Sequence, residues 1–447
     1  MSDETTSVAQ RDKSNGFLGP LATTESWVRR IVLVLTAVAI LTTSFDIAGN
    51  LEVAGYNVRI TQLASLPLVF LGIRSVLRGK DNWVVGGLWL LAWCAVQLLL
   101  SFRSPSITNG IGYWCWLMLD ACIVFGLPAL AQDDVTYRWL AKVYLNSFFV
   151  LAVFGLLQFA LYYAGVNVYL AQVIKGGLAR INGLSYEPSY YATYLFMGFV
   201  LNGYLLEKED FSLLSKVALI RNYVLIVLAI VLTNSRMAYL VMALWFVLRM
   251  GAMIVNAIRA RKEGGKARLP LYFWITLACM AAGVMLLVAL GMNYKTLMRG
   301  FGIVGKNSQS ADDRLAGLTT CLQVFGASPL LGYGLGGVDP AIAQFRGAAY
   351  QGGDNGAAMS IAGELLVANG IVGMIPFVGY LWSLFFGDKR HVRDPESPWH
   401  TLHLAMLWAL AFEFIILLFN QNILRPYLWM HIAFVAASWN HARKAVA

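Results

Sequence analysis

The fold is decided by residues 219–248, which read LIRNYVLIVLAIVLTNSRMAYLVMALWFVL. Two apolar runs, 216–234 and 236–258, meet here, and together they are too long for one membrane helix of roughly 20 residues. The sequence therefore predicts two membrane-spanning helices joined by a tight turn at Asn234, Ser235 and Arg236. This turn places an arginine at the membrane surface with almost no loop around it.

The rest of the chain has the same apolar character. Of its 447 residues, 58% are hydrophobic and 13% are charged, which is typical of polytopic membrane proteins and not of soluble domains. We predict an all-α membrane protein whose domain covers 27–447, after a polar, cytoplasmic N-terminal tail at 1–26. The apolar runs predict about twelve spans, near 28–48, 60–78, 83–102, 110–131, 139–163, 188–206, 216–234, 236–258, 270–292, 358–386, 400–420 and 425–441.

The distribution of lysine and arginine predicts the orientation. The basic stretches RARKEGGKAR (259–268) and DKRHVR (388–393) fall on the same side as the N-terminus, and loops rich in these residues face the cytoplasm. Both termini are then cytoplasmic. The long segments 164–187 and 293–357, the second of which lies between spans 9 and 10, face the periplasm.

Composition argues against two kinds of site. The net charge of +10 comes largely from short loops, where orientation requires it, and does not indicate a nucleic-acid partner. The 5 cysteines contain no CxxC pair, so neither a zinc site nor a disulfide framework is predicted.

Two arginines lie on the outer side, which is otherwise poor in positive charge. Arg236 follows the tight turn, and Arg314 stands in the first turn of a helix predicted to begin at Asp312 and Asp313. The arginine fork suits phosphate because it donates two parallel hydrogen bonds and stays charged. Both side chains, with the helix N-terminal amides, could hold one anion. Alternatively, Arg236 reaches the interface and Arg314 pairs with the aspartates.

A carboxylate stands at the start of the span that begins at Pro188. Glu187 precedes this proline, Tyr190 and Tyr191 follow it, and Arg180 is nearby. Glu187 is either a charge that favours a helix start or a catalytic group that faces a cavity. The tyrosines are either interfacial aromatics or sugar contacts.

Three further polar residues mark the span after the long outer segment. Asp354 and Asn355 stand at its entrance, and Glu364 lies inside it. A carboxylate at membrane depth needs a partner or a wet cavity.

Between these regions lie an apolar helix face and a glycine-rich loop. Leu315, Leu318, Leu322 and Phe325 are spaced for one face of the helix that carries Arg314. The following GYGLGG, residues 332–337, is either a flexible turn or a loop whose amides approach phosphate oxygens.

Four stretches resemble the bacterial O-antigen ligase and polymerase superfamily. They are LTNSRMAYL, DDRLAGLTTCLQVFGASPLLGYGLGG, ELLVANGIVG and SYEPSYYA, in the order and topology of that family. The resemblance implies a metal-independent glycosyltransferase of the GT-C type without a cofactor. Its donor would be an oligosaccharide on undecaprenyl pyrophosphate, used at the periplasmic face of the inner membrane.

The resemblance also implies roles for residues. Arg236 and Arg314 would bind the donor pyrophosphate, with Arg180 nearby, and would neutralise the charge that grows as the lipid leaves. Tyr190, Tyr191 and Asn355 would contact sugar. Besides the bilayer and the lipid-linked substrate, the partners implied are a chain-length regulator and other polysaccharide assembly proteins.

One departure from the family concerns histidine. The ligases carry a histidine where this chain has Met359, and four of the 5 histidines here lie near the cytoplasmic side. The fifth, His431, reads as a hydrogen-bonded interhelical residue. A general base would then be a carboxylate, with Glu187 preferred over Asp354 and Asp354 over Glu364.

The sequence therefore predicts a polymerase of lipid-linked repeat units of a surface polysaccharide or exopolysaccharide. One alternative is an O-antigen ligase that transfers the finished glycan to lipid A core. Another is a transporter or flippase for an anionic lipid-linked solute, which the absence of a visible internal repeat disfavours. A purely structural subunit would not need arginines against the charge bias.

Overall fold

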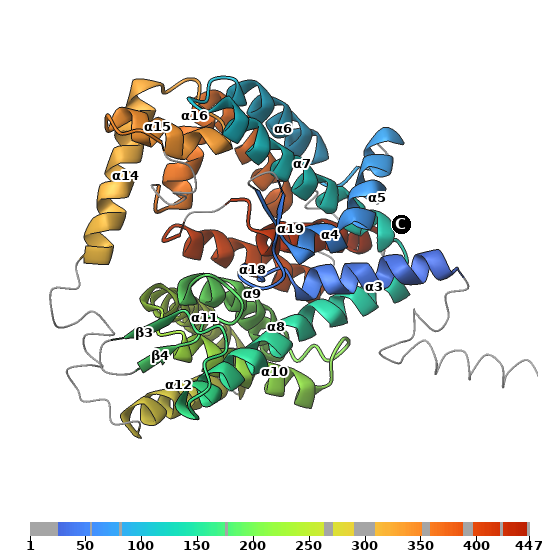
Figure 1. The fold of residues 1–447 in the computed structure, drawn as a ribbon. Helices are drawn as coiled ribbons and strands as arrows, with labels where there is room; N and C mark the ends of the chain where they lie inside the picture. The colour runs from blue at the N-terminus through green and yellow to red at the C-terminus, as the bar shows by residue number, and fades with distance from the viewer. Residues whose placement is uncertain are drawn as a thin grey trace, which may run out of the picture.

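The computed structural model describes residues 26–444, apart from 54–55, 80–82, 175–177, 263–270, 290–308, 351–357, 388–396 and 421–422. It is mostly helical (Figure 1). The first helices are α3 (Trp27–Leu41), α4 (Ile60–Ala64), α5 (Leu66–Leu77), α6 (Gly87–Ser101), α7 (Ile107–Leu130), α8 (Asp134–Tyr163) and α9 (Pro188–Glu207). The later ones are α10 (Lys216–Leu232), α11 (Arg236–Lys262), α12 (Leu271–Ala289), α14 (Gln309–Ala327), η2 (Leu335–Gly337), α15 (Val338–Phe345), α16 (Ile361–Phe386), α18 (His400–Leu417) and α19 (Pro426–Lys444).

Every predicted span contains a helix, with α4 and α5 sharing the segment 60–78. Within the described residues, five helices are long and apolar enough to cross a membrane. They are α7, α8, α16, α18 and the part of α11 at Arg236–Val255. The chain is thus a mostly helical, multi-pass membrane protein.

Two short β-hairpins are additions that the all-α prediction did not include. Strand β1 (Leu51–Val53) pairs with β2 (Tyr56–Val58), and β3 (Gln172–Ile174) pairs with β4 (Leu178–Arg180), both antiparallel. The sequence between β3 and β4 is Lys-Gly-Gly, and glycine is typical of hairpin connections. Arg180 therefore lies on a strand.

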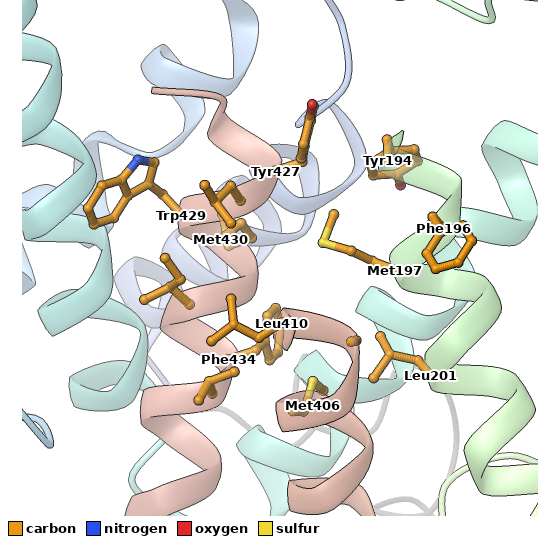
Figure 2. Close-up of a cluster of buried hydrophobic side chains, with 14 of the residues drawn as sticks. Tyr194, Phe196, Met197, Leu201, Met406, Leu410, Tyr427, Trp429, Met430 and Phe434 are labelled. Atoms are coloured by element: carbon orange, nitrogen blue, oxygen red, sulfur yellow. The ribbon is translucent and has the colours of Figure 1, made fainter. Parts of the chain in front are cut away.

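The best-buried part of the core lies between α9, α18 and α19. Figure 2 shows Met197 of α9, Leu410 of α18 and Met430 of α19 within one apolar cluster. Helix α9 packs against both α10 and α18, and most of its side chains are buried. Because α9 begins at Pro188, this packing fixes the position of the residues around Glu187.

Helix α16 is broken, and the glycine-rich loop fills the break. Gly370 has φ 56° and ψ −170°, so the helical bonding pattern is interrupted there. Residues 329–334 pair with the interrupted backbone through Tyr333 N to Val367 O (3.1 Å), Gly334 N to Ala368 O (2.9 Å), Ile371 N to Pro329 O (2.9 Å) and Val372 N to Leu330 O (3.1 Å). At membrane depth, backbone groups need such partners. The loop amides at 333 and 334 are therefore used inside the protein, and GYGLGG is neither a flexible turn nor a phosphate cradle.

Polar side chains hold the same break from the other side. Trp93 Nε1 and Gln97 Nε2 both donate to Asn369 Oδ1 at 2.6 Å. Gln97 Oε1 accepts from Leu335 N at 3.0 Å. These hydrogen bonds connect α6, α16 and η2.

The apolar face predicted for α14 is not its buried face. Leu315 is 65% exposed and Leu322 is 51% exposed, whereas Cys321 and Val324 are buried. A Cβ on Gly363 of α16 would lie 3.0 Å from Cys321 Sγ, so the two helices approach closely through small residues. In a membrane, small residues mark helix contacts better than large apolar ones do.

Candidate functional site

The tight turn predicted at Asn234 is confirmed. Helix α10 ends at Leu232, α11 begins at Arg236, and Asn234 has φ 48° in the left-handed region. Ser235 is buried and Arg236 is exposed. The turn therefore presents the guanidinium group of Arg236 at the end of the helix pair.

Arg180 holds this turn from strand β4. Its Nε donates to Thr233 O at 3.0 Å and its Nη2 to Asn234 O at 3.2 Å, while Nη1 donates to Gln172 Oε1 at 2.8 Å. Three of the five N–H groups of this guanidinium are thus used within the protein, which leaves at most two for a ligand. The geometry makes Arg180 first of all a support for the turn that carries Arg236.

Glu187 is within electrostatic range of Arg180 and Arg314. It is exposed, it immediately precedes Pro188 at the first position of α9, and its Oε2 accepts a hydrogen bond from Ser189 Oγ at 2.9 Å. Its negative charge acts on Arg180.

Arg314 of α14 is within electrostatic range of Arg236 and Glu187. Burial and the charge of Arg236 lower the pKa of Arg314, whereas Glu187 and Tyr190 act in the opposite direction. Burial likewise lowers the pKa of Arg180, with a smaller contribution in the same direction from Arg236. Arg180 and Arg314 are therefore each within electrostatic range of both Arg236 and Glu187.

The helix that carries Arg314 begins earlier than predicted. Because α14 starts at Gln309, Arg314 lies in its second turn. Arg314 therefore lies one turn further from the N-terminal amides than predicted, and a shared anion between Arg314 and these amides stays a prediction.

The two tyrosines behind Glu187 have different surroundings. Tyr190 is partly exposed and lies under the guanidinium of Arg425, whose Cζ is 4.1 Å from the ring centroid. Tyr191 is fully buried and donates to Leu151 O at 2.5 Å. We therefore correct the assignment of Tyr191, which is a packing residue with no surface for a sugar.

Glu364, also predicted for the site, and His431 each have hydrogen-bond partners within the protein. Glu364 is buried, and its Oε2 accepts from Ile423 N at 3.2 Å, so it fastens the loop between α18 and α19. Asp354 and Asn355 lie outside the described residues. His431 is buried between helices with Tyr144 Oη at 2.8 Å and Met406 O at 2.9 Å, as predicted for an interhelical histidine.

Sequence reasoning missed a buried ion triad next to Tyr190. Asp46 Oδ1 lies 2.7 Å from Arg425 Nη1 and 3.1 Å from Arg59 Nη2. Arg59 and Arg425 also fall on the predicted outer side. The charge bias that singled out Arg236 could therefore have identified them.

Comparison with known proteins agrees with these motifs. The O-antigen ligase family model matches residues 222–378, from within α10 to within α16. This region contains Arg236, Arg314 and Glu364, whereas Arg180 and Glu187 lie outside it. No curated protein and no solved structure matches the chain. Residues 222–378, about a third of the chain, are thus similar to the O-antigen ligase family, which supports a relationship to the O-antigen ligase and polymerase superfamily.

Proposed function

We propose that this protein polymerises lipid-linked oligosaccharide repeat units of a surface polysaccharide or exopolysaccharide. It would act as a GT-C-type glycosyltransferase of the bacterial inner membrane, with twelve spans, cytoplasmic termini and a periplasmic active site. The growing chain would pass from undecaprenyl pyrophosphate to the non-reducing end of a new repeat unit. A chain-length regulator and other assembly proteins are the expected partners.

The observation that carries the proposal is that Arg180, which holds the turn before Arg236, and Arg314 are both within electrostatic range of Arg236 and of Glu187. Burial and the repulsion from Arg236 both lower the pKa of Arg314. A bound anion would relieve this repulsion. Pyrophosphate suits it, because a guanidinium binds phosphate oxygens through paired, charge-assisted hydrogen bonds.

In this mechanism Arg236 and Arg314 bind the donor pyrophosphate and Arg180 keeps Arg236 in place. Negative charge grows on the pyrophosphate as the glycosidic bond breaks, so preorganised cations lower the barrier. Glu187 is the proposed base, which takes the proton of the attacking sugar hydroxyl, and Ser189 Oγ orients its carboxylate. Tyr190 is the proposed sugar contact, and Asp354 and Asn355 stay predictions.

An O-antigen ligase is the second candidate, because that is the description of the matching family. The polymerase is preferred because the family histidine position holds Met359 and because His431 is fully engaged between helices. The glycans that accumulate in a deletion strain distinguish the two functions. Loss of a polymerase leaves single repeat units, whereas loss of a ligase leaves long chains on the undecaprenyl carrier.

The test is to replace Arg236 and Arg314 with Ala and with Lys. Binding of undecaprenyl pyrophosphate to the purified protein in nanodiscs and the polysaccharide profile of complemented cells are measured at matched expression. We expect each Ala variant to bind about 10- to 100-fold more weakly, because a hydrogen bond to a charged group contributes about 1.5–3 kcal/mol.

Arg346→Ala is the matched control. Arg346 is also exposed, and its Nη2 donates to Thr320 Oγ1 of α14 at 3.1 Å, but Arg346 is not among the charges that act on Arg314. Its removal should leave binding unchanged. Normal binding and normal polymer length in the Arg236 and Arg314 variants would refute the pyrophosphate role.

A further inference from the structure

The buried triad at Asp46 has more cations than anions. Asp46 and Arg425 are almost fully buried, with side-chain exposures of 3% and 4%, and Arg59 shares the same carboxylate oxygen. Desolvating charges in this way is costly, so such a group contributes little net stability. Its presence at the end of a membrane helix calls for a functional explanation.

Arg425 connects this triad to the cationic site through Tyr190. Its guanidinium lies over the Tyr190 ring at 4.1 Å, a separation typical of cation–π stacking. Tyr190 in turn acts electrostatically on Arg314. Direct contacts thus run from Asp46 through Arg425 to Tyr190, which is within electrostatic range of the proposed pyrophosphate ligand Arg314.

The loop that ends at Arg425 also connects α16 and α9 through hydrogen bonds. Ile361 N at the start of α16 donates to Asn420 O at 2.9 Å, and Asn420 Nδ2 donates to Thr193 Oγ1 of α9 at 3.2 Å. The Arg425 carbonyl accepts from Leu428 N in the first turn of α19 at 3.0 Å. Arg425 is therefore fixed at its backbone and at its guanidinium, and Tyr190 rests on a rigid support.

Arg249, near the other end of α9, has surroundings similar to those of Arg425. Arg249 is buried, its Nε donates to Glu207 Oε2 at 2.8 Å, and its guanidinium lies 5.1 Å from the ring centroid of Tyr204. Here one arginine meets one carboxylate, in contrast to the two arginines at Asp46. Arg249 and Arg425 therefore share burial, an ion pair and aromatic contact, but only Arg425 touches a proposed site residue.

We propose that Arg425 is a positioning residue for glycosyl transfer, held by Asp46 and acting through the ring of Tyr190. The inference rests on the proposed function. Arg425 itself is buried and does not contact substrate; it fixes the aromatic ring against which the sugar next to the pyrophosphate is placed. Lysine keeps the charge but lacks the planar group that stacks on the ring.

The experiment compares Arg425→Lys, Tyr190→Leu and the double variant with Arg249→Lys. Purified proteins in nanodiscs of phosphatidylethanolamine and phosphatidylglycerol are assayed for undecaprenyl pyrophosphate affinity, for kcat and KM with lipid-linked repeat units extracted from the host, and for thermal stability. Arg425→Lys and Tyr190→Leu should each lower kcat about tenfold with Kd and KM within about threefold of wild type. The double variant should lose no more than either single variant, because both changes break the same connection. Arg249→Lys should lose comparable thermal stability and keep its kcat.

Two results would overturn the positioning role while the proposed function stands. They are a normal kcat for Arg425→Lys, and losses that multiply in the double variant. If Arg425→Lys does not fold, Arg425→Gln replaces it in the comparison, and a normal kcat of Arg425→Gln overturns the inference. Absence of undecaprenyl pyrophosphate binding by the wild type, or normal binding by Arg314→Ala, refutes the proposed function and the positioning role with it.

Discussion

Replacing Gly370 with alanine should destabilise the protein by about 3 kcal/mol or more. Its backbone, at φ 56° and ψ −170°, lies close to a region that only glycine occupies readily, where another residue pays about 1–3 kcal/mol. A Cβ there would lie 2.7 Å from both Gly332 N and Leu330 O. These are backbone atoms, so the paired segment has to move. That movement weakens the four backbone hydrogen bonds between residues 329–334 and helix α16, each of which contributes about 1 kcal/mol.

Unfolding of Gly370→Ala is followed by tryptophan fluorescence in detergent, alongside Gly251→Ala. Gly251 lies within α11, and a Cβ there would meet no atom within 4 Å. Alanine at this helical position should stabilise the protein by about 0.5–1 kcal/mol. The two variants should therefore shift the unfolding midpoint in opposite directions. Equal midpoints for Gly370→Ala and wild type would show that the loop pairing does not support α16.

Three further variants test residues placed outside the reaction. Tyr191→Phe should cost about 1 kcal/mol in thermal unfolding, because the buried hydrogen bond to Leu151 O is lost, and should leave turnover unchanged. His431→Leu should cost about 1–3 kcal/mol and keep its turnover per folded molecule, whereas loss of a base would lower turnover roughly 10²–10⁴-fold. Asp133→Ala removes the N-cap of α8 and should cost about 1 kcal/mol at neutral pH. Burial opposes the charged form of Asp133, but hydrogen bonds from Thr136 and Arg29 outweigh it and lower the pKa of Asp133 below 3.8. The difference in stability between wild type and variant is therefore fully present above pH 3.8. It should disappear as the pH falls through the lowered pKa.

Features that depend on local sequence were predictable. The turn before Arg236 follows from the length of the two apolar runs, and the start of α9 follows from Pro188, which fits the first turn of a helix. The orientation that places Arg236 and Arg314 on the outer side follows from the bias of positive charge toward the cytoplasm, and it stays a prediction. These signals lie within a few residues of the feature that they predict.

Features that depend on partners distant in sequence were not predictable. The break at Gly370 becomes possible only because residues 329–334 supply hydrogen bonds, and the interior position of Tyr191 depends on Leu151 in another helix. The buried face of α14 was missed for a different reason. Leu315 and Leu322 are as compatible with lipid as with a protein core, so hydrophobicity does not tell the two surroundings apart in a membrane.

The division of the site between matched and unmatched segments suggests a division of labour. Arg236 and Arg314, the proposed pyrophosphate ligands, both lie within the matched region 222–378. Tyr190 and Arg425 lie outside it, on segments that packing brings to the same place. A pyrophosphate is the same in every lipid-linked donor, whereas the sugars differ. The cations can therefore belong to a shared framework, while recognition of a particular sugar has to come from side chains that surround them, and we expect the start of α9 and the α18–α19 loop to supply it.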